Sequence, residues 1–152
     1  MSMPPAPRTW PMARIPDPVP VAPARALAPT RSDGPVLVVD DDAAVRHALK
    51  FALELEGLSV RLYQGGGEVL ADADLPSRGC LVVDHFMPAM TGVELVEGLR
   101  RRDVALPAIL ITAKATADLR ERAVRAGFRQ VLEKPLEDGA LVDSIRDALA
   151  LA

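Results

Sequence analysis

Short apolar runs alternate with stretches of helical apolar spacing along most of this chain, and this alternation constrains its fold more than any other feature. The runs are continuously apolar and rich in β-branched residues, which is typical of strands buried on both faces of a sheet. We expect these strands at residues 36–39, 58–63, 80–83, 107–111 and 131–132. The stretches between and after them predict helices at about 45–55, 68–73, 93–99, 116–126 and 141–149.

Strands that alternate with helices predict βαβ units, a parallel sheet and right-handed crossovers. Helices must then cover both faces of the sheet. The expected fold class is therefore α/β, with one doubly wound parallel sheet of five strands and five helices over residues 35–152. In such folds ligands bind beyond the carboxyl ends of the strands, so a functional site is expected at that edge.

Proline marks a boundary near the start of the predicted domain. Ten of the 14 prolines lie in residues 1–35, and proline lacks a backbone donor, so this stretch cannot build helix or sheet ladders. Residues 1–34 are therefore predicted to form a disordered, proline-rich N-terminal tail, with a docking role around Trp10 as the alternative. Met12 is an alternative start of the natural protein.

Composition excludes several classes of protein. A single cysteine excludes an intrachain disulfide framework and a multi-cysteine metal site. Together with the lack of a secretory signal, the low cysteine content indicates the cytoplasm. No apolar run reaches the length of about 18 residues that a membrane helix needs, so no membrane association is expected. The net charge of −3 argues against a primary nucleic-acid binder, which normally carries a basic face.

Acidic, hydroxyl and amine side chains follow four of the five predicted strands. In chain order these residues are Asp40 and Asp41, then Asp84, Thr112 and Lys134. Carboxylates that converge in one crevice repel one another and favour a hard divalent cation such as Mg²⁺. A carboxylate can also act as a nucleophile and form an aspartyl phosphate, while an amine and a hydroxyl stabilise the phosphoryl oxygens. We interpret the set as a phosphoryl acceptor.

Several neighbouring residues have a structural interpretation. Asp42 is expected to cap the first helix rather than to bind metal, because aspartate is a favoured N-cap. Thr91 and Glu94 form a capping-box pattern before the third helix. Cys80 is interpreted as a small buried apolar residue, and His85 as a surface histidine rather than a catalyst.

Four motifs in this order resemble the receiver domain of two-component response regulators. They are Val36–Asp42 (VLVVDDD), Leu81–Gly92 (LVVDHFMPAMTG), Ile109–Ala113 (ILITA) and Lys134-Pro135. The resemblance covers residues 36–150 and implies the flavodoxin-like strand order 2-1-3-4-5. It implies a signalling switch that receives a phosphoryl group from a histidine kinase, and not an enzyme.

The resemblance also assigns a role to each strand-end acid. Asp84 would accept the phosphoryl group. Mg²⁺ would be bound by Asp40, Asp41 and Asp84, with the backbone carbonyl of Phe86 as a further ligand.

The same resemblance implies how the switch works. Thr112 and Lys134 would bind the phosphoryl oxygens, and the peptide bond from Lys134 to Pro135 would be cis. The charge added at Asp84 would draw both side chains inward and shift a pre-existing conformational equilibrium.

Three positions depart from the usual pattern of the family. Val131 lies three residues before the lysine, where the family usually has an aromatic ring that turns inward with the threonine. Because valine is small and stiff at χ1, phosphoryl acceptance is expected to survive, but the aromatic readout is not. His85 and Phe86 are also unusual, and Phe86 and Lys114 would flank the path of an attacking water, so an atypical lifetime of the aspartyl phosphate is expected.

The folded part ends near the last residue, so the sequence predicts a stand-alone cytoplasmic receiver without an output domain. Its partners would be a sensor histidine kinase or a phosphotransfer protein, and a downstream protein. The surface formed by residues 116–126, 131–132 and 141–149 offers a contact for a homodimer. Direct binding to nucleic acid or membrane is not expected.

Two alternatives remain open. A haloacid-dehalogenase-like phosphatase has a strand-end Asp nucleophile, a second Asp two residues later, then a Thr or Ser and a Lys. The same order is present here in Asp40 as the nucleophile, Asp42, Thr112 and Lys134. Ala44, where that family usually has Thr or Val, speaks against it. The other alternative is a degenerate receiver that serves as an unphosphorylated scaffold, which the missing aromatic keeps open.

Overall fold

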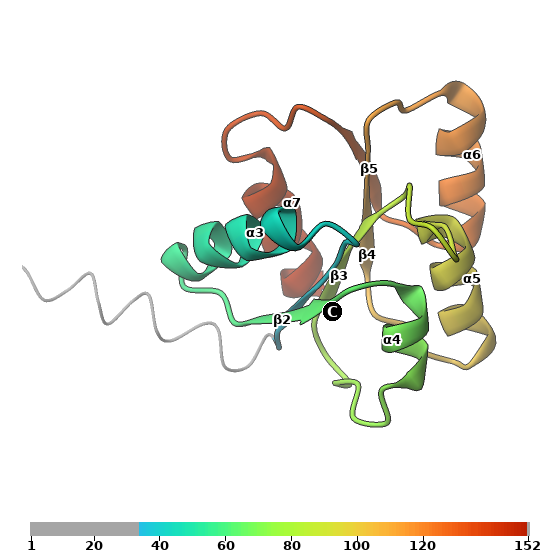
Figure 1. Cartoon of the computed structure of the whole chain (residues 1–152), viewed down its shortest axis with the longest axis horizontal. Coiled ribbons are helices and arrows are strands. Elements are labelled where there is room, and N and C mark those ends of the chain that lie inside the picture. Colours follow the sequence, from blue (N-terminus) through green and yellow to red (C-terminus); the bar gives the residue numbers. More distant parts are fainter. Residues whose placement is uncertain (1–33, 152) are drawn as a thin grey trace, which may run out of the picture.

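One parallel sheet with helices on both faces makes up the fold (Figure 1). The computed structural model describes residues 34–151. The strands are β1 Val36–Val39, β2 Val60–Tyr63, β3 Cys80–Asp84, β4 Ala108–Thr112 and β5 Gln130–Glu133. The helices are α3 Ala43–Leu55, α4 Gly66–Ala71, α5 Gly92–Arg101, α6 Ala117–Ala126 and α7 Ala140–Leu151. All neighbouring strands are parallel, in the order β2-β1-β3-β4-β5, which confirms the predicted fold class and strand order.

The described chain begins just before β1. The predicted tail at residues 1–34, with Trp10 and Met12, lies outside the described residues apart from Gly34. The carbonyl of Pro35 accepts a hydrogen bond from the N–H of Cys80 at 3.1 Å, so pairing with β3 starts at once. None of the helices within residues 34–151 is both long and apolar enough to cross a bilayer.

The two faces of the sheet bury separate apolar clusters, because successive side chains of a strand point to opposite faces. In β1, Leu37 and Val39 pack into the cluster that includes side chains of α4, α5 and α6. Val36 and Val38 pack into the cluster that includes side chains of α3 and α7. Figure 1 shows the same division of helices on the two sides of the sheet. A strand buried on both faces must be apolar throughout, which explains the continuous apolar runs.

The predicted start of β2 is wrong by two residues. β2 begins at Val60 and not at residue 58, because Leu58 completes the preceding helix end. The N–H of Leu58 donates to the carbonyl of Leu53 at 3.2 Å, and its side chain is buried. Gly57, with a φ of +87°, allows this helix end, as its position after the apolar repeat predicts.

The short helix α4 lies two residues earlier than the predicted 68–73. It ends before Asp72, whose carboxylate accepts hydrogen bonds from the hydroxyl of Tyr63 at 2.6 Å and the N–H of Asp74 at 2.7 Å. Such side-chain bonds offer the backbone an alternative to the helix. The backbone of Asp72 is accordingly extended.

The helices that follow β1 and β3 are capped as the sequence predicts. The side chain of Asp42 accepts hydrogen bonds from the N–H groups of Ala44 at 2.9 Å and Val45 at 3.2 Å. Thr91 and Glu94 form a complete capping box at the start of α5. These caps determine where α3 and α5 begin, and therefore how the chain leaves the two strands.

The loop between β3 and α5 folds tightly onto the end of β3. The carbonyl of His85 accepts hydrogen bonds from the N–H groups of Met87 and Gly92, each at 3.1 Å. A Cβ atom at Gly92 would lie 2.9 Å from the carbonyl oxygen of Asp84 and 2.8 Å from Cδ1 of Leu110. The close approach of α5 to the sheet therefore requires glycine at this position.

Gly92→Ala is expected to lower the free energy of unfolding by about 1–3 kcal/mol, because the added methyl group must displace backbone. Gly98→Ala in the same helix is the matched control, since a Cβ atom there meets nothing closer than 3.7 Å. This control is expected to stabilise the fold by roughly 0.5–1 kcal/mol. Urea unfolding measures both variants, and equal stability of the two would contradict the packing described for α5.

Candidate functional site

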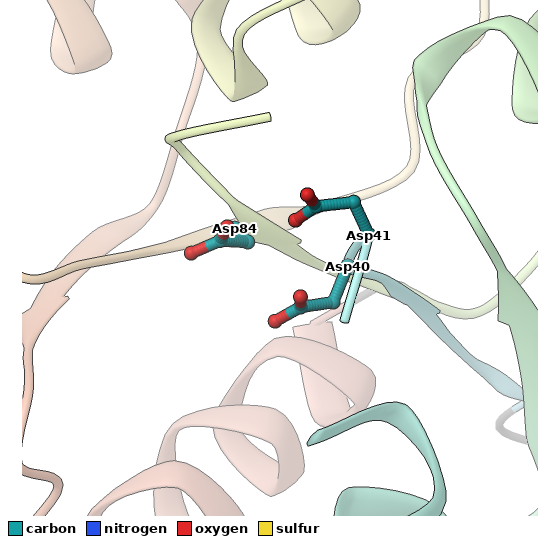
Figure 2. A group of neighbouring side chains, drawn as sticks. All are labelled: Asp40, Asp41 and Asp84. Atoms are coloured by element: carbon teal, nitrogen blue, oxygen red, sulfur yellow. The ribbon is translucent and has the colours of Figure 1, made fainter. Parts of the chain in front are cut away.

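The carboxyl ends of β1 and β3 bring Asp40, Asp41 and Asp84 together (Figure 2). One carboxylate oxygen from each residue lies within 4.8 Å of the other two. β1 and β3 are neighbouring parallel strands, paired up to Val39 and Val83, so the residues that follow reach the same edge. In Figure 2 the carboxylate groups point to the same side of the two strand ends.

Asp40 is held by its own turn and by a buried arginine. Its Oδ1 accepts a hydrogen bond from the N–H of Asp42 at 2.9 Å. Its backbone carbonyl accepts a hydrogen bond from Nη1 of Arg46 at 2.8 Å, and this contact is buried. Arg46 is not among the residues predicted from the sequence, although its helical spacing from Leu49 and Leu53 indicates the inward face of α3.

Asp84 contacts a lysine and lies close to the other two carboxylates. Its side chain is buried, and Nζ of Lys134 lies 3.4 Å from its Oδ1. Burial, followed by the charge of Asp40, raises the pKa of Asp84 above its ordinary value; Lys134 lowers it and Asp41 raises it further. Burial and the neighbouring carboxylates together therefore disfavour the charge of Asp84 more than Lys134 favours it.

The ends of β4 and β5 place Thr112 and Lys134 at the same edge. The Thr112 side chain is fully buried. Its hydroxyl accepts a hydrogen bond from the N–H of Lys114 at 3.2 Å and donates one to the carbonyl of Lys114 at 3.3 Å. The backbone N–H of Lys134 donates to the carbonyl of Thr112 at 2.8 Å, and the peptide bond from Lys134 to Pro135 is cis. The hydroxyl of Thr112 is thus engaged with its own loop.

The two residues after Asp84 have opposite environments. His85 is only 6% exposed, so the prediction of a surface histidine is wrong. The reason is that strand pairing continues one residue further: the N–H of His85 donates to the carbonyl of Ile111 at 2.9 Å. Burial and then the charge of Arg122 lower the pKa of His85. Phe86 is 59% exposed, and its ring meets that of His85 edge to face.

Two further positions have the environment of packing residues. Val131, at the place of the family's aromatic, is half-buried against the cluster on the α5 and α6 side of the sheet. Cys80 is fully buried at the start of β3, and burial raises the pKa of its thiol to about 12. Cys80 therefore packs as a small apolar side chain, as predicted.

Comparison with known proteins agrees with this fold. The model of the response regulator receiver domain matches residues 36–146. The chain belongs to this family. Receiver domains are signalling switches of two-component systems.

The chain is 39% identical over 116 residues to the transcriptional regulatory protein FixJ of Azorhizobium caulinodans. The aligned region covers 76% of this chain and 54% of that protein. The chain is also 38% identical over 123 residues to the C4-dicarboxylate transport transcriptional regulatory protein DctD of Pseudomonas aeruginosa. That aligned region covers 81% of this chain and 27% of that protein. Superposition on the crystal structure of FixJ-N gives a TM-score of 0.71 at 36% sequence identity. The match covers 77% of this chain and 94% of FixJ-N. The chain thus spans about half the length of FixJ, and less of DctD.

The donor set at the strand ends fits Mg²⁺. Hard divalent cations prefer oxygen ligands, and Mg²⁺ keeps several waters in its shell. Three carboxylates lie within 4.8 Å of one another, and one of them, Asp41, is exposed, which leaves room for waters. Burial and then the charge of Asp40 raise the pKa of Asp84, and a bound cation would offset both effects.

Mg²⁺ is expected to raise the melting temperature of the wild-type chain, and Asp41→Asn to remove most of this gain because one of three carboxylates is lost. At a cation concentration ten times the dissociation constant, the stabilisation is about 1.4 kcal/mol. Asp42→Asn is the matched control, because it makes the same charge change at the neighbouring residue and asparagine also caps helices. Thermal unfolding with and without Mg²⁺ measures the effect, and an equal loss in both variants would contradict the site.

Asp84→Asn is expected to stabilise the fold in a chelator at neutral pH by about 0.5–2 kcal/mol. The pKa of Asp84 is raised in the folded state, so its charge destabilises the fold above that pKa, and the effect disappears as the pH falls through it. The advantage of the variant should therefore be largest at neutral pH and shrink in acid. Urea unfolding at several pH values measures it. A less stable variant at neutral pH would mean that the Lys134 contact outweighs burial and the charge of Asp40 together.

Proposed function

We propose that this receiver domain accepts a phosphoryl group on Asp84 from a phosphohistidine of a sensor kinase or phosphotransfer protein, with Mg²⁺ as cofactor. The observation that carries the proposal is the meeting of three carboxylates within 4.8 Å, with the amine of Lys134 3.4 Å from Asp84. Asp84 is assigned as the acceptor because the ammonium group of Lys134, which would bind the phosphoryl oxygens, lies beside it.

In the transfer, a carboxylate oxygen of Asp84 forms a bond to phosphorus while the bond from phosphorus to the donor imidazole nitrogen breaks. The electron pair of the broken bond stays on that nitrogen. A divalent cation held by Asp40, Asp41 and Asp84, with the carbonyl of Phe86, would neutralise charge on the phosphoryl oxygens. Lys134 would donate a hydrogen bond to another of these oxygens. Positioning and charge neutralisation are most of what phosphoryl transfer requires.

Thr112 is the residue through which a phosphoryl group on Asp84 would change the conformation of the protein. Its hydroxyl bonds both the N–H and the carbonyl of Lys114. A turn of the hydroxyl toward a phosphoryl group on Asp84 would break both bonds and free the start of the loop that leads to α6. Such a local exchange of hydrogen bonds is enough to shift a two-state equilibrium.

We assign the signal to protein contacts made by the surface of α6, β5 and α7. The contact would be with a downstream protein or with a second copy of this chain, and the exposed Val124 of α6 would lie in it. Val131 brings no aromatic ring to this surface, so the readout must use other groups. We assign the protein to the cytoplasm, where transfer from a sensor kinase would take place.

The hydrogen bonds of the Asp42 side chain argue against the phosphatase alternative. In that alternative Asp40 is the nucleophile and Asp42 handles protons. Here the carboxylate of Asp42 accepts hydrogen bonds from the N–H groups of Ala44 and Val45 and caps α3. A carboxylate held in this way by its own helix is not directed to a substrate.

Incubation with Mg²⁺ and acetyl phosphate is expected to add the mass of one phosphoryl group to the wild-type chain and none to Asp84→Asn, because the nucleophile is lost. Intact-mass spectrometry measures the gain, and fragmentation locates it. Asp42→Asn is the matched control and should be labelled like wild type. Label on Asp40 would establish the phosphatase alternative, and no label on any variant would establish the scaffold.

A further inference from the structure

The histidine after the proposed acceptor has a ring nitrogen without a partner. Within residues 34–151, Nδ1 of His85 is the one buried side-chain nitrogen or oxygen that makes no hydrogen bond. An unpaired buried polar atom costs free energy, and folded proteins pair nearly all of them. Such an atom is available to accept a hydrogen bond from a partner that arrives in another state of the molecule.

His85 points to the side of the sheet that α5 and α6 cover. Leu81 and Val83 of β3 belong to the apolar cluster on that side, and side chains alternate along a strand, so His85 faces the same way. Its N–H donates to the carbonyl of Ile111 and extends the pairing of β3 with β4 by one residue. This pairing sets His85 beside Thr112.

Charged groups on both covering helices act on the imidazole ring. Glu94 on α5 and Arg122 on α6 interact electrostatically with His85. The ring of Phe86 closes another side, with ring centroids 4.8 Å apart. The side chain of His85 therefore follows the proposed acceptor in sequence and lies on the side of the sheet that α6 covers. The loop after Thr112 leads to the same helix.

The loop after Thr112 holds a donor that matches the unpaired nitrogen. The N–H of Lys114 donates to the hydroxyl of Thr112 at 3.2 Å. When that hydroxyl turns to a phosphoryl group, the N–H loses its acceptor. A neutral imidazole nitrogen without a proton can accept one hydrogen bond. A released donor and an unpaired acceptor on neighbouring strand ends can then satisfy each other.

We propose that His85 is a positioning residue that couples Asp84 to α6: its Nδ1 accepts a hydrogen bond from the backbone of the β4–α6 loop once Thr112 turns to the phosphoryl group. This inference rests on the proposed function and adds a readout that Val131 cannot supply. The bond forms in the phosphorylated state alone, so it favours the position that α6 takes in that state.

Nitrogen-15 NMR of the imidazole rings tests the bond directly. The chain has two histidines, and His47→Asn, a change at an exposed position of α3, assigns the remaining signals to His85. The spectra are taken at mildly alkaline pH, where imidazole is neutral. Beryllofluoride with Mg²⁺, a stable analogue of the phosphoryl group, is expected to move the Nδ1 signal toward that of a hydrogen-bonded acceptor. A protonated Nδ1, or an unchanged signal in a chain that binds beryllofluoride, overturns the inference.

Three substitutions separate the hydrogen bond from packing. Asparagine carries its amide oxygen one bond from Cγ, as histidine carries Nδ1, whereas glutamine carries it one bond farther. His85→Asn is expected to keep the change in amide hydrogen exchange of α6 that phosphorylation causes. His85→Gln and His85→Leu are expected to reduce the equilibrium constant for that state about fivefold, the effect of one hydrogen bond of ordinary strength. All three should take up a phosphoryl group as the wild type does.

Phosphoryl uptake is measured by mass in the same samples, so the two proposals fail in different ways. A wild-type chain that gains no phosphoryl group contradicts the proposed function. A wild-type response of α6 in His85→Leu, with normal uptake, contradicts this inference alone. Loss of the response in all three variants means that the ring acts through packing, and also overturns it. Where a variant does not fold, the NMR measurement on the wild-type ring decides.

Discussion

The repulsion between carboxylates at the ends of two neighbouring parallel strands is the interaction on which the rest of this structure depends. β1 and β3 pair in register, so Asp40 and Asp84 reach the same edge and cannot separate without breaking the ladder. Arg46 and the N–H of Asp42 hold Asp40 in place. The fold therefore keeps a destabilising cluster that a cation and an incoming phosphoryl group can exploit, which is the usual relation between stability and function.

The site lies where the two packed layers of the molecule meet. Arg46 connects Asp40 to α3 on one face of the sheet. On the other face, His85 connects the end of β3 to the layer that contains α5 and α6. A change of charge at Asp84 therefore occurs next to groups that reach both layers.

Much of this arrangement follows from local chemistry and could be predicted. Asp42 and Thr91 cap the helices they precede, because capping depends on residues within one turn. Leu58 is predicted as the start of a strand and instead closes a helix end, since a buried apolar residue fits either position. The environment of His85 could not be read from its neighbours, because burial there depends on pairing with a strand far along the chain.

The sequence by itself determined the alternation of strands and helices, the two-faced burial of the strands and the kinds of side chain at their ends. These features depend on periodicity and on residue chemistry, which are local. The tertiary structure alone decided that three carboxylates share one region, that Lys134 reaches Asp84, and that a ring nitrogen of His85 is left without a partner. Those facts depend on strand order and register, since only long-range pairing brings residues 40, 84, 112 and 134 to one edge.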